Sequence, residues 1–343
     1  MREETEPADW AEGADASEDM GDGRIGLYAR ASSAARYSRI VDSRLELPKI
    51  ARADDTCVVV DLALSHPSAD VFVPDGVPLD RALARTTHLA IGAHADDLEF
   101  FAWHGISACL DRDDRWFTGI VVTDGGGSPR AGAYADWTDA RMIEERRAEQ
   151  REAARIGRYS AMIQLGLPSA VVKDARDTRA ERDLEHILRW VRPQVAYLHN
   201  PADRHDSHVA VLLRSLRALR AMPVEARPPT VYGCEVWRDL DWAVRSDRIE
   251  LPAGDRPELQ AELAAVFRTQ IAGGKRYDLA VPARRVAHAT FGDSHSVDGV
   301  GGVTLAVDLA PLVHDPEADP LAFALAMVDR LATDVRARFA RTG

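Results

Sequence analysis

The stretch LAIGAHADDLEFF occupies residues 89–101. Its apolar start is typical of the end of a buried strand, and Gly92 ends the apolar run. Four ionisable side chains then follow within a few residues, namely His94, Asp96, Asp97 and Glu99. Two interpretations are open at this point. The segment is either a strand-to-helix turn whose carboxylates cap the helix, or part of a metal site.

Strand-like and helix-like segments alternate from residue 87 onward. The segments typical of strands are 87–94, 116–127, 160–166, 194–201 and 230–237. The segments typical of helices are 98–112, 139–158, 181–192 and 207–222. In the charged helix at 139–158, the residues expected to face the core are Met142, Ile143, Ala153 and Ile156. This alternation predicts an α/β fold with a Rossmann-like, mostly parallel sheet and helices on both of its faces.

Three regions of the chain differ in composition. Residues 1–24 are acidic and poor in aliphatic side chains, which predicts a disordered tail. Residues 25–85 contain one apolar run and a segment rich in Pro and Asp, so we expect a small strand-rich extension packed on the core. Residues 86–343 hold the alternating pattern and form the main predicted domain.

The overall composition argues against several classes of partner. The chain has 343 residues and a formal net charge of -12, so nucleic acid, which requires a basic surface, is not an expected partner. No apolar segment approaches the roughly 20 residues of a membrane span, and the acidic N-terminus does not resemble a signal peptide. The widely spaced Cys57, Cys109 and Cys234 predict free thiols. We therefore expect a cytoplasmic protein, and a homo-oligomer is compatible with the sequence.

Polar side chains collect where the predicted strands end. In open α/β sheets, ligands bind beyond the carboxyl ends of the strands. The segment HNPADRHDSH at residues 199–208 follows one strand, as His94 and Asp97 follow another. His205 and His208 are three residues apart, so both lie on one face at the start of a helix. A catalytic zinc takes three ligands from His, Asp or Glu, and two strand ends can supply such a set.

Two motifs resemble the signatures of the LmbE/PIG-L family of metal-dependent N-acetylglucosaminyl deacetylases. The first, AHADDLE at residues 93–99, is similar to the family's AHPDDxE signature. The second, HNPADRHDSH, is similar to its downstream HPDH-type motif. The resemblance covers roughly residues 87–240 and implies that residues 86–343 form a deacetylase domain. It also implies an enzyme that removes acyl groups from N-acylated amino sugars.

The resemblance implies a role for each of five residues. His94, Asp97 and His208 correspond to metal ligands. Asp96 corresponds to the general base, and His205 to an electrophilic or acid partner. The implied cofactor is one Zn2+ per chain, or another divalent metal. Zinc polarises a carbonyl, an adjacent carboxylate can take a proton from water, and a cationic His can stabilise the oxyanion.

Two positions depart from the family pattern. Ala95 stands where the family has Pro, so the backbone of this loop is less restricted in φ. Asp206-Ser207 stands where the family has Pro-Asp, which displaces by one position the Asp that orients the catalytic His. Asp206 is therefore a candidate for support of the site. Asp203 is the alternative orienting residue and a candidate substrate contact.

Other candidate residues lie outside the two motifs. Arg130 ends the glycine-rich segment TDGGGSPR, which either cradles a ligand or forms a surface loop. Arg147 is a candidate substrate contact because its helix resembles the family's helix after the second strand. Tyr277 belongs to the polar region 270–300, which is either a lid or a structural loop. Glu99 either supports a ligand His or favours the helix N-terminus.

The combined pattern predicts a zinc-dependent hydrolase that removes an N-acyl group, in the first instance N-acetyl, from a small amino-sugar metabolite. Two alternative enzymatic functions would use the same metal site, namely an amidase of a thiol-sugar conjugate and an esterase. A non-catalytic sugar-binding relative is the alternative of a different class. The intact set of His94, Asp96, Asp97, His205 and His208 argues against that last alternative.

Overall fold

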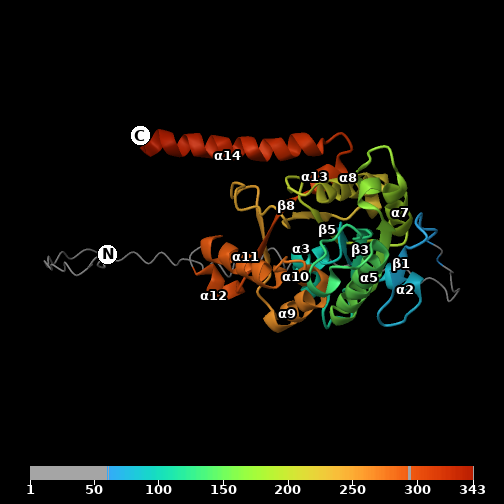
Figure 1. The fold of residues 1–343 in the computed structure, drawn as a ribbon. Helices are drawn as coiled ribbons and strands as arrows, with labels where there is room; N and C mark the ends of the chain where they lie inside the picture. The colour runs from blue at the N-terminus through green and yellow to red at the C-terminus, as the bar shows by residue number, and fades with distance from the viewer. Residues whose placement is uncertain (1–59, 61, 293–294, 343) are drawn as a thin grey trace, which may run out of the picture. The chain divides into compact units, whose positions relative to one another are not determined.

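The computed structural model describes residues 60, 62–292 and 295–342. The predicted tail at 1–24, most of the predicted extension at 25–85 and Cys57 lie outside the described residues. The strands are β1 (Asp70–Phe72), β2 (His88–Gly92), β3 (Phe117–Thr123), β4 (Ala161–Leu167), β5 (Val195–His199), β6 (Thr230–Cys234), β7 (Ile249–Pro252) and β8 (Val303–Asp308). Figure 1 shows how these strands and the surrounding helices are arranged.

The helices lie mainly between the strands in the chain. Those before β6 are α2 (Leu79–Ala84), α3 (Asp97–Phe101), α4 (Trp103–Cys109), η1 (Gly132–Tyr134), α5 (Asp139–Ile156), α6 (Ser169–Lys173), α7 (Arg179–Leu188), α8 (Asp206–Ala221) and η2 (Val224–Ala226). Those after β6 are α9 (Pro257–Val266), α10 (Arg268–Ala272), α11 (Tyr277–Gly292), α12 (Ser296–Val300), α13 (Ala310–His314) and α14 (Pro320–Thr342).

The strands form one eight-stranded sheet in the order β1-β4-β3-β2-β5-β6-β8-β7. The five strands from β4 to β6 in this order run parallel to one another. β1, β8 and β7 pair in antiparallel fashion at the two edges. The sheet therefore confirms the predicted α/β class with a mostly parallel sheet. The strand order reverses between β2 and β5, and such a reversal is where open α/β sheets bind ligands.

Helices cover both faces of the sheet, as a parallel sheet requires. Leu89 and Ile91 of β2 pack into one apolar cluster, which includes the inner faces of α7, α8 and α13. Ala90 packs into a second cluster on the opposite face, with α3, α4, α5 and α9. Successive side chains of a strand point to opposite faces of the sheet. β2 therefore packs against apolar side chains on both faces, and all five of its residues are buried. Only the ends of the central strands are then left for polar chemistry.

The described part of the predicted extension joins the edge of the sheet. Residues 70–72 pair with β4, and Ala82 and Leu83 of α2 are fully buried. Arg151 of α5 forms an ion pair with Asp70, which ties this edge to the helix beside it. The predicted boundary between residues 85 and 86 stays a prediction.

Two further sequence expectations concern thiols and membrane spans. Cys109 and Cys234 are buried free thiols, which confirms the prediction for these two residues. Within residues 60, 62–292 and 295–342, no helix combines the length and the apolar character that a bilayer span needs.

Candidate active site

The candidate site lies beyond the carboxyl ends of β2 and β5, where the strand order reverses. His94 and Asp97 follow β2, and His205 and His208 follow β5. Neighbouring parallel strands end at the same edge of a sheet, so the two motifs meet although they are far apart in the chain.

Asp97 organises the loop after β2. Its Oδ2 accepts hydrogen bonds from the backbone N–H groups of Ala93 at 3.0 Å and His94 at 2.7 Å. The side chain of His94 bends back to the same oxygen, with Nδ1 at 3.3 Å. Asp97 is 2% exposed. These contacts hold His94 and Asp97 in one rigid turn at the start of α3.

Three potential ligand atoms converge from the two motifs. His208 Nε2 lies 3.2 Å from His94 Nδ1 and 3.5 Å from Asp97 Oδ1. Ligands about 2.0–2.2 Å from a tetrahedral zinc are separated from one another by roughly 3.3–3.6 Å. The separation of His94 and His208 therefore fits a shared metal ion, and with His205 these residues form a candidate ligand group. Asp97 borders both histidines, His94 through Oδ2 and His208 through Oδ1, so we treat His94, Asp97 and His208 as the candidate metal site.

The protonation states of the first two residues suit metal binding. Burial lowers the pKa of His94 to about 4, even though contact with Asp97 acts in the opposite direction. Burial by itself would raise the pKa of Asp97, but the contacts with His208, His199 and His94 outweigh burial and hold this pKa well below its usual range. At neutral pH the pair is thus a neutral imidazole and a carboxylate, the forms in which both bind metals.

His199, the last residue of β5, has a role that the sequence analysis did not assign. Its ring is fully buried and stacks on His208 with the ring centroids 4.0 Å apart. His199 groups with Asp97 and His208 as a second potential ligand set. However, its Nε2 accepts a hydrogen bond from the Ala93 N–H at 2.9 Å, so that lone pair is already used. The hydrogen bond favours the set that contains His94.

Asp203 lies behind His208. It is 8% exposed, and its Oδ2 lies 3.4 Å from His208 Nδ1. The same carboxylate accepts hydrogen bonds from the backbone N–H groups of His205 and Trp237. A carboxylate behind a ligand histidine fixes the orientation of the ring. Asp203 is therefore placed to orient His208 and does not line the cavity at the site, and its contact with a substrate stays a prediction. The side chain of Asp206 is exposed at the start of α8, and its support of the site stays a prediction.

Asp96 combines burial, backbone strain and an unpaired oxygen. Its φ of +96° is uncommon for any residue except glycine, and such strain persists where the surroundings impose it. Its backbone N–H donates to Gln150, and the residue is 3% exposed. Oδ2 has no hydrogen-bond partner among the described residues, and the Arg146 guanidinium lies 3.8 Å away. Burial raises the pKa of Asp96 to about 8, although Arg146 lowers it.

His205 has one ring nitrogen in a hydrogen bond at the start of α8, and its role as an electrophilic or acid partner stays a prediction. Its Nδ1 accepts a hydrogen bond from the Ser207 N–H at 3.3 Å, so the ring carries its proton on Nε2. Burial and the nearby His208 both lower its pKa. The His205 ring centroid lies 4.9 Å from that of His94. His205 is therefore placed beside the candidate metal site with one N–H to donate.

α5 presents Arg146 to the site. Arg146 is 1% exposed, and its guanidinium donates to Ala95 O at 2.5 Å and to Ser128 Oγ at 2.9 Å. Gly125 makes room for it, because a Cβ at this position, where φ is +71°, would meet Arg146 Nε at 2.8 Å. The inner face of α5 also includes the buried polar residues Glu149 and Gln150. Ile143 and Ile156, which the sequence predicts to face the core, are only partly buried.

Two arginines predicted to contact substrate lie elsewhere. Arg147 donates to Ser68 O, because consecutive side chains on a helix point about 100° apart and Arg146 takes the inward direction. Arg130 pairs with Asp139 at 2.5 Å and does not line the cavity at the site. Contact of either arginine with a substrate stays a prediction, and the positions of their side chains do not favour it.

A cavity of about 180 Å³ lies over the candidate metal site. The glycine-rich loop after β3 forms one wall, and the side chains of Trp237, Lys275 and Tyr277 contribute to the lining. The segment predicted as a ligand cradle or surface loop therefore borders the site. Tyr277 also borders it, and its contact with a substrate stays a prediction.

Glu99 supports the loop from behind and does not contact a ligand histidine. Its Oε1 accepts hydrogen bonds from Tyr159 at 2.7 Å and from Gln150 at 2.9 Å. Gln150 in turn holds the backbone N–H of Asp96. Burial raises the pKa of Glu99 to about 7, and these two hydrogen bonds offset only part of the effect.

The raised pKa of Glu99 predicts a pH-dependent effect of Glu99→Gln on stability. The folded state binds more protons than the unfolded state between about pH 4.5 and pH 7, so the wild type loses stability as pH rises through this window. Glutamine mimics the protonated form. We expect the melting temperature of the variant, relative to wild type, to be several degrees higher at pH 8 than at pH 5, corresponding to at most roughly 3 kcal/mol. An equal difference at both pH values would contradict a buried carboxylate whose pKa is raised.

The fold and the site together define a class, an α/β protein with a His/Asp candidate metal site at a strand-order reversal. Residues 89–218 match the PIG-L family, described as GlcNAc-PI de-N-acetylase. Over residues 89–218 the chain is therefore similar to the PIG-L family, in agreement with the resemblance of the two sequence motifs.

The chain is also similar to individual proteins in sequence or in fold. The uncharacterized deacetylase YaiS of Escherichia coli (strain K12) is 29% identical over 163 residues, which are 44% of this chain and 77% of that protein. The N,N'-diacetylchitobiose deacetylase of Pyrococcus horikoshii has a TM-score of 0.50 and 16% identity, covering 67% of this chain and 86% of that chain. The 4-carboxy-2-hydroxymuconate hydratase of Pseudomonas putida has a TM-score of 0.48 and 19% identity, covering 65% of this chain and 95% of that chain.

Proposed function

We propose that this chain is a zinc-dependent hydrolase that removes an N-acyl group, in the first instance N-acetyl, from a small amino-sugar metabolite. One observation carries the proposal. A buried carboxylate whose Oδ2 has no partner among the described residues, Asp96, lies next to three converging potential ligands, His94, Asp97 and His208. Amide hydrolysis needs both an activated water and a base that does not itself bind the metal.

His94, Asp97 and His208 would hold the metal. When bound, a zinc ion polarises the amide carbonyl and lowers the pKa of water to roughly 7. Asp203 keeps the ring of His208 oriented, and the Ala93 and His94 N–H groups keep Asp97 oriented. The set is therefore held in place by groups that do not themselves bind the metal.

Asp96 and His205 would carry the proton transfers. Asp96 takes one proton from the attacking water as the water oxygen forms a bond to the carbonyl carbon. The Nε2–H of His205 donates a hydrogen bond to the oxyanion that develops. The C–N bond then breaks, Asp96 returns its proton to the leaving nitrogen, and an amine and a carboxylic acid are released. A base with a raised pKa suits both halves of this cycle, and a divalent cation beside Asp96 would bring its pKa closer to neutrality.

Two observations support an amino-sugar substrate. The family that includes residues 89–218 is described by an N-acetylglucosamine-containing lipid substrate. The cavity also carries aromatic side chains, Trp237 and Tyr277, whose faces suit the apolar C–H surface of a sugar ring. Both features leave the group attached to the sugar open.

The proposal is tested with zinc-loaded protein and a panel of N-acyl amino sugars, with detection of free primary amine and of released acid. We expect amine release from N-acetylglucosamine or its glycosides. A chelator should reduce the rate by at least about 100-fold, and added Zn2+ should restore it. Esters of the same sugars, included in parallel, report esterase activity. If zinc-loaded protein releases no amine from any member of the panel, the proposed function is wrong.

A further inference from the structure

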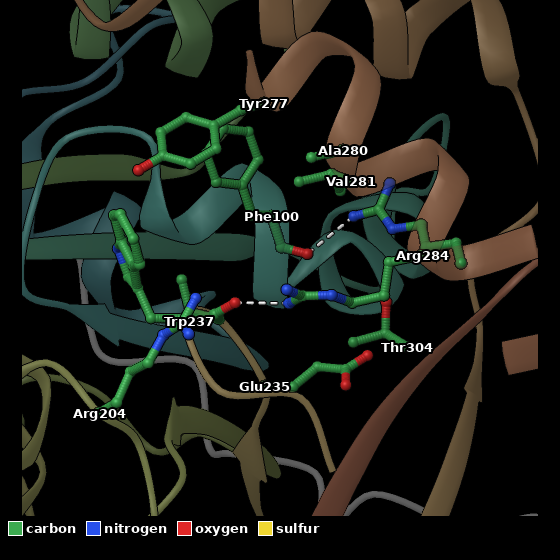
Figure 2. Close-up of a pocket in the computed structure, with 11 residues that line it drawn as sticks. Phe100, Arg204, Glu235, Trp237, Tyr277, Ala280, Val281, Arg284 and Thr304 are labelled. Carbon is green, nitrogen blue, oxygen red and sulfur yellow. Dashed lines mark hydrogen bonds between the residues drawn. The ribbon is translucent and has the colours of Figure 1, made fainter. Parts of the chain in front are cut away.

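A second cavity of about 220 Å³ adjoins the candidate active site. Trp237 and Tyr277 line both cavities, so the two share a wall. Most of the lining of the second cavity comes from residues beyond 218, outside the part of the chain that matches the family. Figure 2 shows this cavity, with Trp237 and Arg204 on one side and Arg284 and Thr304 on the other.

The body of this cavity is apolar and aromatic. Phe100 and Tyr277 pack with their ring centroids 4.9 Å apart, and Trp237 meets Tyr277 edge-on at 6.2 Å. Ala280 and Val281 of α11 continue the same apolar lining. A surface of this kind binds a ring or another compact apolar group.

Positive charge lines the same cavity. Neither Arg204 nor Arg284 forms an ion pair with a carboxylate within residues 60, 62–292 and 295–342. Arg284 donates to the backbone oxygen of Val236 at 2.5 Å, and the guanidinium of Arg204 lies 5.5 Å from the centroid of the Trp237 ring. Both side chains therefore keep N–H groups with which they can bind an anion.

The acidic and buried groups of the cavity do not cancel this charge. Glu235 is the one carboxylate in the lining, and its two oxygens accept from the Leu305 and Leu240 N–H groups and contact His288. Arg285, a third arginine in the lining, is 5% exposed, and its Nε–H has no partner among the described residues. An unpaired buried donor costs free energy that an acceptor on a ligand would recover.

We propose that this second cavity is the subsite for the aglycone of the amino-sugar substrate, and that it selects an apolar, ring-like aglycone that carries an anionic group, carboxylate or phosphate. The inference rests on the proposed function. In a 2-acylamino sugar the amide and the aglycone are on neighbouring ring carbons. The aglycone can therefore reach a cavity that adjoins the amide site. Arg204 and Arg284 bind its anion, and Phe100 and Val281 contact its apolar body.

The arginines also argue against the acyl group as the occupant. An alkyl chain placed against Arg284 and Arg285 would desolvate guanidinium groups without offering them an acceptor. A guanidinium pairs well with the planar oxygens of carboxylate and phosphate, which makes an anion the matching chemistry.

The test compares two aryl glycosides of N-acetylglucosamine that differ in charge alone, the 4-carboxyphenyl and the 4-carbamoylphenyl compounds. We expect zinc-loaded wild type to show a kcat/KM at least about 10-fold higher for the carboxylate. Arg284→Gln, which keeps a donor for Val236 O, should bring this ratio close to one. Arg204→Gln, at an exposed position where folding is not at risk, should lower it in the same direction. A 4-phosphonophenyl glycoside shows whether phosphate serves as well as carboxylate.

Arg276→Gln is the matched control, because Arg276 is exposed, lies just before α11 and lines neither cavity. It removes the same charge and should leave the ratio unchanged. Equal kcat/KM values for the charged and neutral glycosides, with no effect of Arg284→Gln or Arg204→Gln, would overturn the subsite and leave the hydrolase intact.

A binding measurement separates this inference from the proposed function. Calorimetry with 4-carboxyphenyl glucoside, which has no amide to cleave, should give an affinity at least about 10-fold higher for wild type than for Arg284→Gln. If this difference appears while no N-acyl sugar is hydrolysed, the anionic subsite stands and the proposed reaction is wrong. If wild type and both arginine variants bind this glucoside equally, the subsite is wrong whatever the enzyme hydrolyses.

Discussion

A chain with alanine at His94, Asp97 and His208 is expected to lose its stoichiometric metal and to hydrolyse its substrate on the order of 1000-fold more slowly than wild type. The three side chains supply the converging atoms of the candidate metal site, with separations of 3.2 to 3.5 Å between them. Removing all of them breaks both groups of potential metal ligands that the described residues form. Elemental analysis after dialysis, together with the rate of amine release, measures both effects.

Two single variants then separate the two overlapping ligand sets. His94→Ala should release the metal, because His94 belongs to the favoured set. His199→Gln should retain it, because Nε2 of His199 already accepts the Ala93 N–H and glutamine can replace that acceptor. The reverse pattern would assign the metal to Asp97, His199 and His208.

His314→Ala is the control for removal of a histidine. His314 is exposed and contacts the backbone of Pro228, away from the site. The His314→Ala variant should keep one metal per chain and hydrolyse substrate at the wild-type rate. The melting temperatures of all variants should be compared on metal-free protein. Undiminished metal in the triple alanine variant would contradict the proposed site.

The sequence predicts those parts of the site in which the spacing of residues along the chain determines how close their side chains lie. His94 and Asp97 are three residues apart at a strand end, so one turn brings them together in any fold of this class. Strand and helix periodicity also predicts that two such loops meet at one edge of a parallel sheet. The pairing of β2 with β5 is the long-range fact that joins His94 to His208, and the structure provides it. The family resemblance implied only that these residues bind one metal.

Periodicity does not decide between adjacent residues of a helix, whose side chains point about 100° apart. Arg146 and Arg147 are adjacent and chemically identical, and the sequence of a charged helix does not show which one faces inward. Arg146 takes the buried position because Ala95 O and Ser128 Oγ accept its N–H groups there. A search for apolar residues at helical spacing does not identify this buried face of α5, because Glu149 and Gln150 are also buried there.

The supporting carboxylate was ambiguous for a related reason. Asp203 and Asp206 flank His205 in sequence, and either spacing is compatible with support of a histidine. The structure places Asp206 in solvent and Asp203 behind His208, so the supported ring is the candidate ligand and not His205. His199 was missed because a histidine at the end of an apolar strand gives no pattern beyond its position.

The last prediction concerns Asp96→Asn, which should retain the metal and lower kcat by at least about 100-fold, the usual contribution of a positioned base. Asparagine keeps the size of the side chain and tolerates positive φ, so the strained backbone at Asp96 should survive the substitution. KM should change little, because the lost interaction belongs to the transition state. The alternative reading makes Asp96 a helix cap, for which asparagine serves equally well.

The structure already gives a reason to prefer the base over the cap. Asp96 occupies the N-cap position of α3, yet its side chain makes no capping hydrogen bond, and Oδ2 has no partner among the described residues. A buried carboxylate held at positive φ without such a bond gains nothing as a cap, whereas a base needs a free oxygen beside the reacting water. Asp139→Asn, in the first turn of α5, is the control for loss of an acidic group at a helix start. Asp139→Asn should have a kcat within a few-fold of wild type. If Asp96→Asn protein with one metal per chain also has a kcat within a few-fold of wild type, Asp96 is not the base and another group accepts the proton.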